Sequence, residues 1–237
     1  MKKFLLVLVT AACVMGAQAQ KTFNDPNAEV RNVSGFHAVK VSSAIDLYLT
    51  QSGSETVAVS AADVKYRDRI RTTVEDGVLR IWFDNDGWKW NTGNKKLKAY
   101  VSVREIDKLV ASGACDVFVD GVLKANSLNI NLSGASDLKA TVEANTLTID
   151  QSGASDANIS GRAGTLKIEV SGASTFKAFD LSTENCLARA SGASDIRITV
   201  TKELNARASG ASSIQYKGDG VIREMHSSGA SSVNKRG

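Results

Sequence analysis

The chain has 237 residues, of which 43% are hydrophobic, and its 29 basic residues face 25 acidic ones. This is enough apolar material for one elongated domain or two small ones. The near balance of charge excludes the basic surface expected of a protein that binds nucleic acid or anionic membrane. Two histidines far apart in sequence, His37 and His226, exclude a His-rich metal enzyme.

Residues 1–19 are typical of a secretory signal. A charged start precedes the apolar run Phe4–Val14, and Ala17-Gln18-Ala19 forms a small-x-small cleavage site. The run is too short to span a bilayer, and no later stretch is long enough. We therefore predict an exported chain without a membrane span, located in the periplasm, at the outer-membrane surface or outside the cell. A lipoprotein signal at Cys13 is the alternative.

Residues 20–104 are predicted to form an irregular, β-rich part. A polar stretch at 21–32 comes first, and Ala61–Arg71 is expected to hold one short helix. Apolar and polar residues alternate elsewhere, which is typical of strands with one buried face. Strands are expected at Phe36–Val41, Ile45–Thr50, Thr56–Val59, Gly77–Phe83 and Leu97–Val103. This part is interpreted as less regular rungs of a coil, or as a cap that protects its first edge.

The segment Asp84–Lys96 is the longest irregular stretch, and it holds the best candidate for a ligand-binding site. Trp88 and Trp90 are separated by one residue, so on a strand both rings point the same way, beside Lys89 and Asn91. Flat rings next to ammonium and amide donors suit stacking on sugar rings or docking of a protein partner. The alternative is that both rings fold back over the end of the coil.

The second half, residues 105–237, is organised by a repeat. The tripeptide Ser-Gly-Ala recurs at a spacing of 18 to 21 residues. Apolar residues occupy fixed positions three and five residues before the tripeptide, and five and seven after it, with mostly polar residues between. The copies begin at Ser112, Ser133, Ser152, Ser171, Ser191, Ser209 and Ser228.

This pattern predicts an all-β fold, a right-handed parallel β-helix of about seven rungs. The recurrence of small residues at one place indicates a corner where stacked backbones pass closely, since Gly permits positive φ there. Repeated Ser side chains at the corner can bond the rungs above and below. A meander of hairpins and a leucine-rich repeat are the competing folds, but the latter would not alternate on both sides of the turn.

The two cysteines that follow the predicted secretory signal are predicted to be free thiols. Cys115 falls in a column otherwise made of serines, and Cys186 falls in an inward apolar column four rungs later. Four rungs of about 4.8 Å separate the two residues by roughly 19 Å, which is beyond the reach of a disulfide.

An acidic column follows the corners, formed by Asp116, Asp137, Asp156 and Asp195. Stacked carboxylates can hold Ca²⁺, although capping of the turn by Asp is the preferred interpretation. Polysaccharide lyases also use parallel β-helices with acidic clusters, which makes Asp137 and Asp156 the candidates for catalysis in an enzyme hypothesis. The columns are regular, however, whereas a catalytic pocket interrupts a repeat, and a shared fold does not confer a function.

Several segments resemble the auto-transporter adhesin head GIN domain family. Ser34–Phe36 and Ser43–Gln51 are similar to the opening of that domain, and Asp76–Ile81, Val101–Leu109 and the Ser-Gly-Ala-Ser-Asp units are similar to later parts. The resemblance implies a β-helical fold and an envelope or extracellular location, in a family of exported proteins common in Bacteroidetes. It brings no catalytic residues to transfer.

We therefore predict an exported, non-enzymatic protein whose stiff polar surface serves adhesion or carbohydrate contact. The expected partner is a glycan or a cell-surface or matrix protein, and no catalytic residue, cofactor or metal is predicted. Two alternatives remain open. One is a polysaccharide-active lyase or hydrolase, and the other is a structural module that forms homo-oligomers through the end or edge of the coil.

Overall fold

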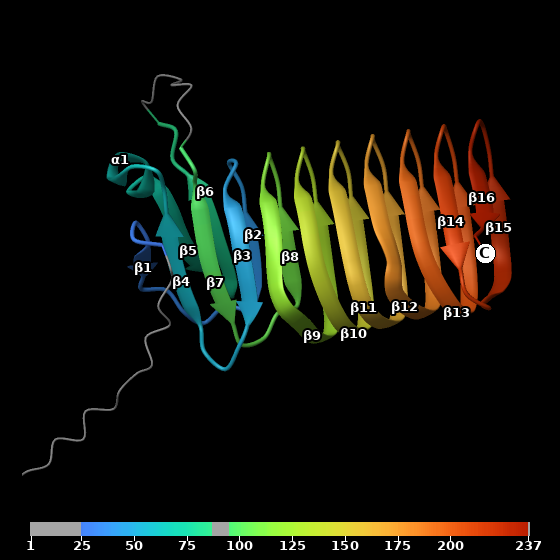
Figure 1. The fold of residues 1–237 in the computed structure, drawn as a ribbon, viewed down its shortest axis with the longest axis horizontal. Coiled ribbons are helices and arrows are strands. Elements are labelled where there is room, and N and C mark those ends of the chain that lie inside the picture. The colour runs from blue at the N-terminus through green and yellow to red at the C-terminus, as the bar shows by residue number, and fades with distance from the viewer. Residues whose placement is uncertain (1–24, 87–94, 237) are drawn as a thin grey trace, which may run out of the picture.

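The computed structural model describes residues 25–86 and 95–236, which form an elongated β-solenoid (Figure 1). Within these residues, sixteen strands join into one hydrogen-bonded network, and one short helix, α1 (Val64–Arg67), lies near its N-terminal end. In the described ranges, no helix is both long and apolar enough to cross a membrane.

The second half is a parallel β-helix, as the repeat predicts. Each of its long strands bends around most of one rung and pairs in parallel, largely in register, with the strand of the next rung. The prediction of a coil is therefore confirmed over the meander and the leucine-rich repeat. The strands are β9 (Asp116–Leu132), β10 (Asp137–Gln151), β11 (Asp156–Val170), β12 (Thr175–Ala190), β13 (Asp195–Ala208), β14 (Ser213–Lys217), β15 (Val221–Ser227) and β16 (Ser232–Lys235).

The corners of the coil explain the Ser-Gly-Ala repeat. At Gly153 the backbone has φ +82°, and a Cβ there would collide with the carbonyl oxygen of Gly134 in the previous rung. The next residue, Ala154, donates its N–H to that same carbonyl over 2.7 Å. Inside the corner, the buried Ser155 hydroxyl donates to the carbonyl of Ser152 over 2.9 Å. Glycine is therefore needed where consecutive rungs touch through their backbones.

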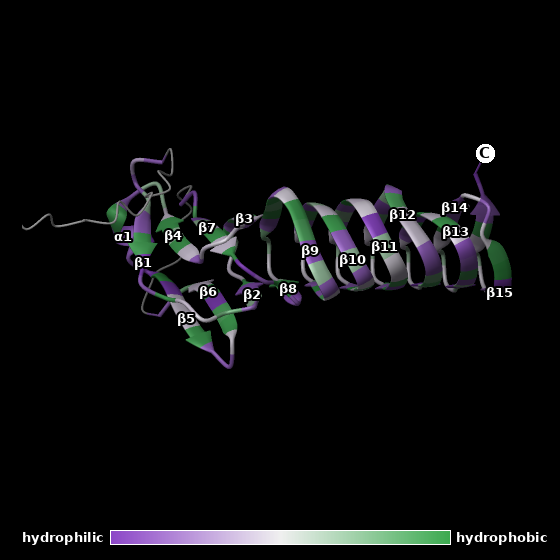
Figure 2. Cartoon of the chain, turned by 90° about the horizontal axis from the view of Figure 1, so that it is seen from below, coloured by the Kyte–Doolittle hydropathy of each residue, from purple (hydrophilic) through white to green (hydrophobic). Residues whose placement is uncertain are grey.

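The core is a continuous apolar column along the coil. Leu128, Leu147, Leu166, Cys186 and Leu204 stack in register and are all buried. Along each strand, polar residues that face outward alternate with these buried residues, which gives the alternating bands of Figure 2. Cys115 is also buried and both thiols are free, so the prediction from rung spacing is confirmed.

The N-terminal part splits into two layers that diverge in Figure 2. One continues the coil through the order β1-β4-β7-β3-β9, and the other runs from β5 through β6 and β2 to β8. The bounds are β1 (Glu29–Arg31), β2 (Ala38–Val41), β3 (Asp46–Gln51), β4 (Thr56–Ser60), β5 (Ile70–Glu75), β6 (Val78–Phe83), β7 (Lys98–Val103) and β8 (Lys108–Ala111).

The strands predicted in this part are confirmed, with two corrections. The polar stretch 21–32, in which no strand was expected, contains β1. Strand β5 was not expected either. Both are edge strands that pair antiparallel to their neighbours, β1 with β4 and β5 with β6. Their side chains are mostly half-buried or exposed, so the sequence pattern is weak there.

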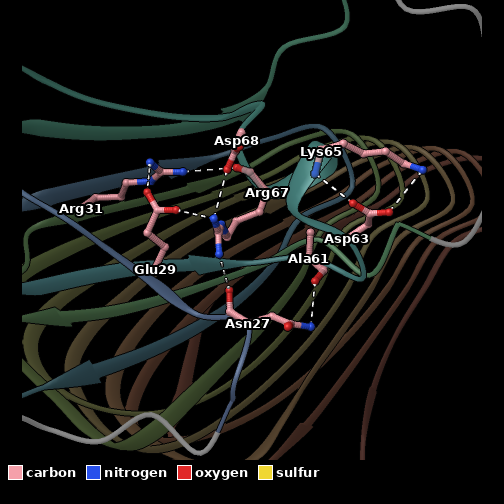
Figure 3. Close-up of polar contacts among 8 residues, drawn as sticks. All are labelled: Asn27, Glu29, Arg31, Ala61, Asp63, Lys65, Arg67 and Asp68. Carbon is pink, nitrogen blue, oxygen red and sulfur yellow. Dashed lines mark hydrogen bonds and ion pairs between the residues drawn. The ribbon is translucent and has the colours of Figure 1, made fainter.

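Polar contacts tie β1 to the segment around α1 (Figure 3). The Arg67 guanidinium lies 2.8 Å from the Glu29 carboxylate, which also pairs with Arg31 over 2.7 Å. Asn27 donates its side-chain N–H to the carbonyl of Ala61 over 3.3 Å. At the start of α1, the Asp63 carboxylate accepts the N–H of Lys65 over 3.0 Å and caps the helix. These contacts cover one edge at the N-terminal end of the coil.

The coil starts earlier than the Ser-Gly-Ala repeat indicates. Strand β3 pairs in parallel with β9, and β2 pairs in parallel with β8. Between them, Ser43 and Ala44 adopt φ +69° and +58°, which makes Ser42-Ser43-Ala44 a corner of the same kind without glycine. The division into residues 20–104 and 105–237 stays a prediction from repeat regularity, and hydrogen bonding runs across it.

Candidate functional site

The predicted ligand-binding residues Trp88, Lys89, Trp90 and Asn91 lie outside the described residues, so their arrangement stays a prediction. The chain on both sides of that segment is placed. Arg69 donates to the carbonyl of Asp86 over 2.7 Å, and the Lys95 ammonium lies 4.7 Å from the centre of the Phe83 ring.

A different group of aromatic side chains meets on the outside of the coil. Tyr100 of β7, Tyr48 of β3 and Phe118 of β9 share one register position on three neighbouring strands. Their rings form a stack, with centroids 5.2 Å apart for Tyr100 and Tyr48 and 5.4 Å apart for Tyr48 and Phe118. The spacing of parallel strands, about 4.8 Å, sets these distances.

The two ends of this aromatic stack differ. At one end, the Tyr100 hydroxyl donates to the Asp25 carboxylate over 2.8 Å. Burial, together with that hydrogen bond, raises the pKa of Tyr100 well above its usual value, so the phenol stays a donor. At the other end, Phe118 is 40% exposed and bears no hydroxyl. The stack is therefore anchored at Tyr100 and open at Phe118.

A shallow hollow of about 160 Å³ lies beside Phe118. The residue in register with Phe118 on the next rung is Lys139, followed by Asn158 and Lys177. The aromatic stack therefore ends where the hollow begins, and polar side chains occupy the same register position on the following strands. The hollow is lined by Val117, Phe118, Asp137, Leu138, Lys139, Asp156, Ala157, Asn158 and Lys177.

Two columns border this hollow, one that carries carboxylates and one that carries ammonium and amide groups. The Lys177 ammonium lies 3.6 Å from the Asp156 carboxylate. Burial, and then the neighbouring charges of Asp116 and Asp156, raise the pKa of Asp137 above its ordinary value. The site thus offers carboxylate acceptors, ammonium and amide donors, and one aromatic side chain, all on a rigid sheet.

The acidic column is longer than the sequence pattern indicated. Strand β3 brings Asp46 next to Asp116, and burial together with the Asp116 charge raises the pKa of Asp46. The missed signal was Ser42–Asp46, which matches Ser112–Asp116 except that Ser43 replaces glycine and Ile45 replaces cysteine. Among the residues that the structure describes, no group of three or more His, Cys, Asp or Glu side chains is placed to hold a metal ion.

Three arginines in the rungs near the acidic column lie on different sides of the coil. Arg197 continues the column of Lys139, Asn158 and Lys177 on the strand leg that follows each corner. Arg189 and Arg207 lie on the leg that precedes the corner, where they pair with Glu169 and Glu224. Only Arg197 therefore shares a face with the acidic column.

Comparison with known families shows which protein family this chain belongs to. A family model described as "Putative auto-transporter adhesin, head GIN domain" matches residues 35–220. The chain belongs to this family. The match spans both the N-terminal layers and the regular coil, and the resemblance carried by the sequence motifs is confirmed. Comparison with curated proteins yields no match.

Solved structures of the same fold come from Bacteroidetes. A putative adhesin from Bacteroides fragilis is 21% identical, with a TM-score of 0.82, and the match covers 88% of this chain and 96% of that one. A putative lipid binding protein from Parabacteroides distasonis has 21% identity, a TM-score of 0.68 and coverage of 90% and 98%. A putative adhesin from the same species has 19% identity, a TM-score of 0.70 and coverage of 88% and 96%. At these identities the likeness concerns the fold alone.

Proposed function

We propose that this protein is an exported, non-enzymatic adhesin-type protein that contacts glycans through the hollow beside Phe118. The observation that carries the proposal is the aromatic stack of Tyr100, Tyr48 and Phe118, which stops at a hollow bordered by charged side chains while its last ring stays exposed. Membership of the adhesin family supports the general role. The predicted leader at residues 1–19 supports export.

A pyranose ring suits this hollow as the next member of the stack. Its apolar C–H face would pack on Phe118, at the position where Lys139 replaces a fourth ring. Its hydroxyls would donate to Asp137 and Asp156 and accept from Lys177. Every group named here stands on a strand, and only the flexible Lys139 side chain would have to move aside.

The Trp88–Asn91 segment is proposed as a second contact, as its composition indicates. Two contacts on one stiff molecule would favour a polymeric glycan over a single sugar, because the second contact forms at high effective concentration. A cell-surface or matrix protein that bears glycans is the natural source of such a ligand.

The experiment is a glycan-array screen of the chain from residue 20, followed by titration of the best ligand. The test variant is Phe118→Ala, and the matched control is Phe179→Ala, since Phe179 is another outward aromatic but lies beneath the Lys217 ammonium, away from the hollow. We expect Phe118→Ala to weaken binding about tenfold, equivalent to ~1.4 kcal/mol. Phe179→Ala should bind like the parent chain.

A Trp88→Ala/Trp90→Ala variant separates the two contacts. Loss of binding in this variant alone, with Phe118→Ala unaffected, would move the site to the Trp segment and refute the hollow. A parent chain that binds no glycan would refute the proposal as a whole and leave a protein partner.

The enzyme hypothesis is tested on the same ligands. The pKa of Asp137 is raised, which is the direction that a general acid requires, and Asp156 is its neighbour. We expect each bound glycan to be recovered intact after long incubation. Cleavage products that form with the parent chain but not with an Asp137→Asn variant would instead establish a lyase or hydrolase.

A further inference from the structure

The C-terminal end of the described coil is uncovered. Strand β15 pairs only with β13, and β16 pairs only with β14, within the described residues. Ile222 and Met225 stand in register with the buried Leu204 and Ala206, so they belong to the apolar core columns. They are nevertheless 38% and 46% exposed, and Val221 is 57% exposed. This strand edge combines unpaired backbone groups with core side chains.

The opposite end of the coil also has edge strands, but polar contacts cover one of them. The edge strand there, β1, has only three residues and is tied to α1 by the Glu29, Arg31 and Arg67 contacts of Figure 3. The other edge strand, β5, pairs antiparallel to β6. A head-to-tail stack would set the open rung against these antiparallel, charged elements, which do not continue a parallel coil. The difference between the ends favours contact between two C-terminal ends.

We propose that two copies of this chain associate tail to tail, with β15 of one copy pairing antiparallel to β15 of the other across a two-fold axis. Two-fold symmetry makes the paired strands antiparallel, because each edge meets an inverted copy of itself. The contact then closes on itself as a dimer and does not propagate into a fibre.

The sequence of β15 is self-complementary in this arrangement. The pairing of β15 with β13 shifts register at Arg223, so Ile222 and Met225 face the same side. The register that sets Ile222 opposite Met225 of the partner subunit then sets Arg223 opposite Glu224 of the partner subunit, and symmetry forms each pair twice. Apolar side chains meet apolar ones, and charges of opposite sign meet. Within one copy, Arg223 pairs with Glu203 over 2.6 Å and Glu224 pairs with Arg207 over 2.7 Å. The added pairs would extend this network.

The test is sedimentation velocity of the chain from residue 20 over a wide range of protein concentration. We expect a dimer that dissociates on dilution, and we expect Ile222→Lys/Met225→Lys to sediment as a monomer while remaining folded by circular dichroism. The matched control is Val30→Lys/Val64→Lys, since these valines are as exposed but lie at the opposite end. The control variant should dimerise like the parent chain.

Three results would overturn the proposal. The parent chain could stay monomeric at the highest concentration, the control could lose the dimer as fully as the test variant, or the oligomer could grow without limit as a filament. Oxidative cross-linking adds a check on register. A mixture of Arg223→Cys and Glu224→Cys chains should form a mixed disulfide, and a dimer without one would refute this pairing.

This association is independent of the proposed glycan contact. Phe118 lies on β9, far along the coil from β15 (Figure 1). Phe118→Ala should therefore dimerise normally, so failure of either proposal is distinguishable from failure of the other.

Discussion

At the scale of single residues, the corner glycines are the most constrained positions of this molecule. Each stacked corner holds a backbone with positive φ directly against the carbonyl of the previous corner, as Gly153 does against Gly134. Neither the conformation nor the space suits a side chain, so two separate penalties apply to any substitution.

We expect Gly153→Ala to lower the free energy of unfolding by about 1–3 kcal/mol or more, because the methyl group must displace the neighbouring rung and a left-handed φ is strained. Gly53→Ala is the matched control, since Gly53 has ordinary φ and no atom lies within 4 Å of the place that its added methyl group would take. It should change stability little. Urea unfolding of both variants measures the difference, and equal effects would refute the corner argument.

At the scale of elements, the strand legs after each corner carry like charges in register. Asp46, Asp116, Asp137 and Asp156 follow one another across neighbouring strands. Like charges directly opposite in a sheet repel, and this repulsion contributes to the raised pKa of Asp137. A column of this kind lowers stability, which is compatible with a role in binding rather than in folding.

The raised pKa of Asp137 fixes the sign of a pH prediction. The folded chain holds the Asp137 proton more tightly than the unfolded chain, so this group favours folding at low pH and the benefit is lost as pH rises through the folded pKa. We expect Asp137→Asn to be more stable than the parent chain at pH 7, by roughly 0.2–1 kcal/mol, and the gain to vanish below about pH 3.

Asp63→Asn provides a control of opposite sign. The N–H of Lys65 lowers the pKa of Asp63, so that carboxylate stabilises the fold at neutral pH and the effect is lost as pH falls. We expect Asp63→Asn to be less stable than the parent chain at pH 7. Thermal unfolding from pH 3 to pH 8 follows both variants, and a shared sign would contradict the assignments.

At the scale of the whole molecule, contacts run mainly between neighbouring rungs. Such a solenoid loses structure from its ends inward, and the two ends here differ, one partly covered by α1 and β1 and one open at β15. Local opening should therefore be more frequent near the C-terminal end than near the rung that holds Cys115.

The buried thiols report this difference. Burial raises the pKa of Cys186 to about 12 and also raises that of Cys115, so neither native thiol should react at neutral pH. In mild denaturant we expect Cys186 to be modified faster than Cys115, because fewer rungs separate it from the open end. Mass spectrometry of the alkylated peptides gives both rates. Equal rates would show that the coil opens as one unit.

Much of the fold follows from the sequence because a solenoid repeats a local rule. The spacing of Ser-Gly-Ala, the apolar columns and the small corner residues all recur within about 20 residues, so neighbouring rungs can be aligned without knowing the rest of the chain. The parallel coil and the free state of Cys115 and Cys186 are consequences of that alignment. The corner at Ser42-Ser43-Ala44 was not predicted from the sequence, because it lacks the glycine of the repeat.

The tertiary structure alone decided what the irregular part contributes. Tyr48 and Phe118 follow two equivalent corners, one of them without glycine, whereas Tyr100 comes from a segment without such a corner. Only the pairing of β7, β3 and β9 stacks the three rings beside the hollow. The antiparallel edges β1 and β5 depend on the same long-range pairing. The sequence determined the coil through its local periodicity. The cap and the candidate site depend on which distant strands become neighbours, because the register of pairing decides which side chains on adjacent strands meet.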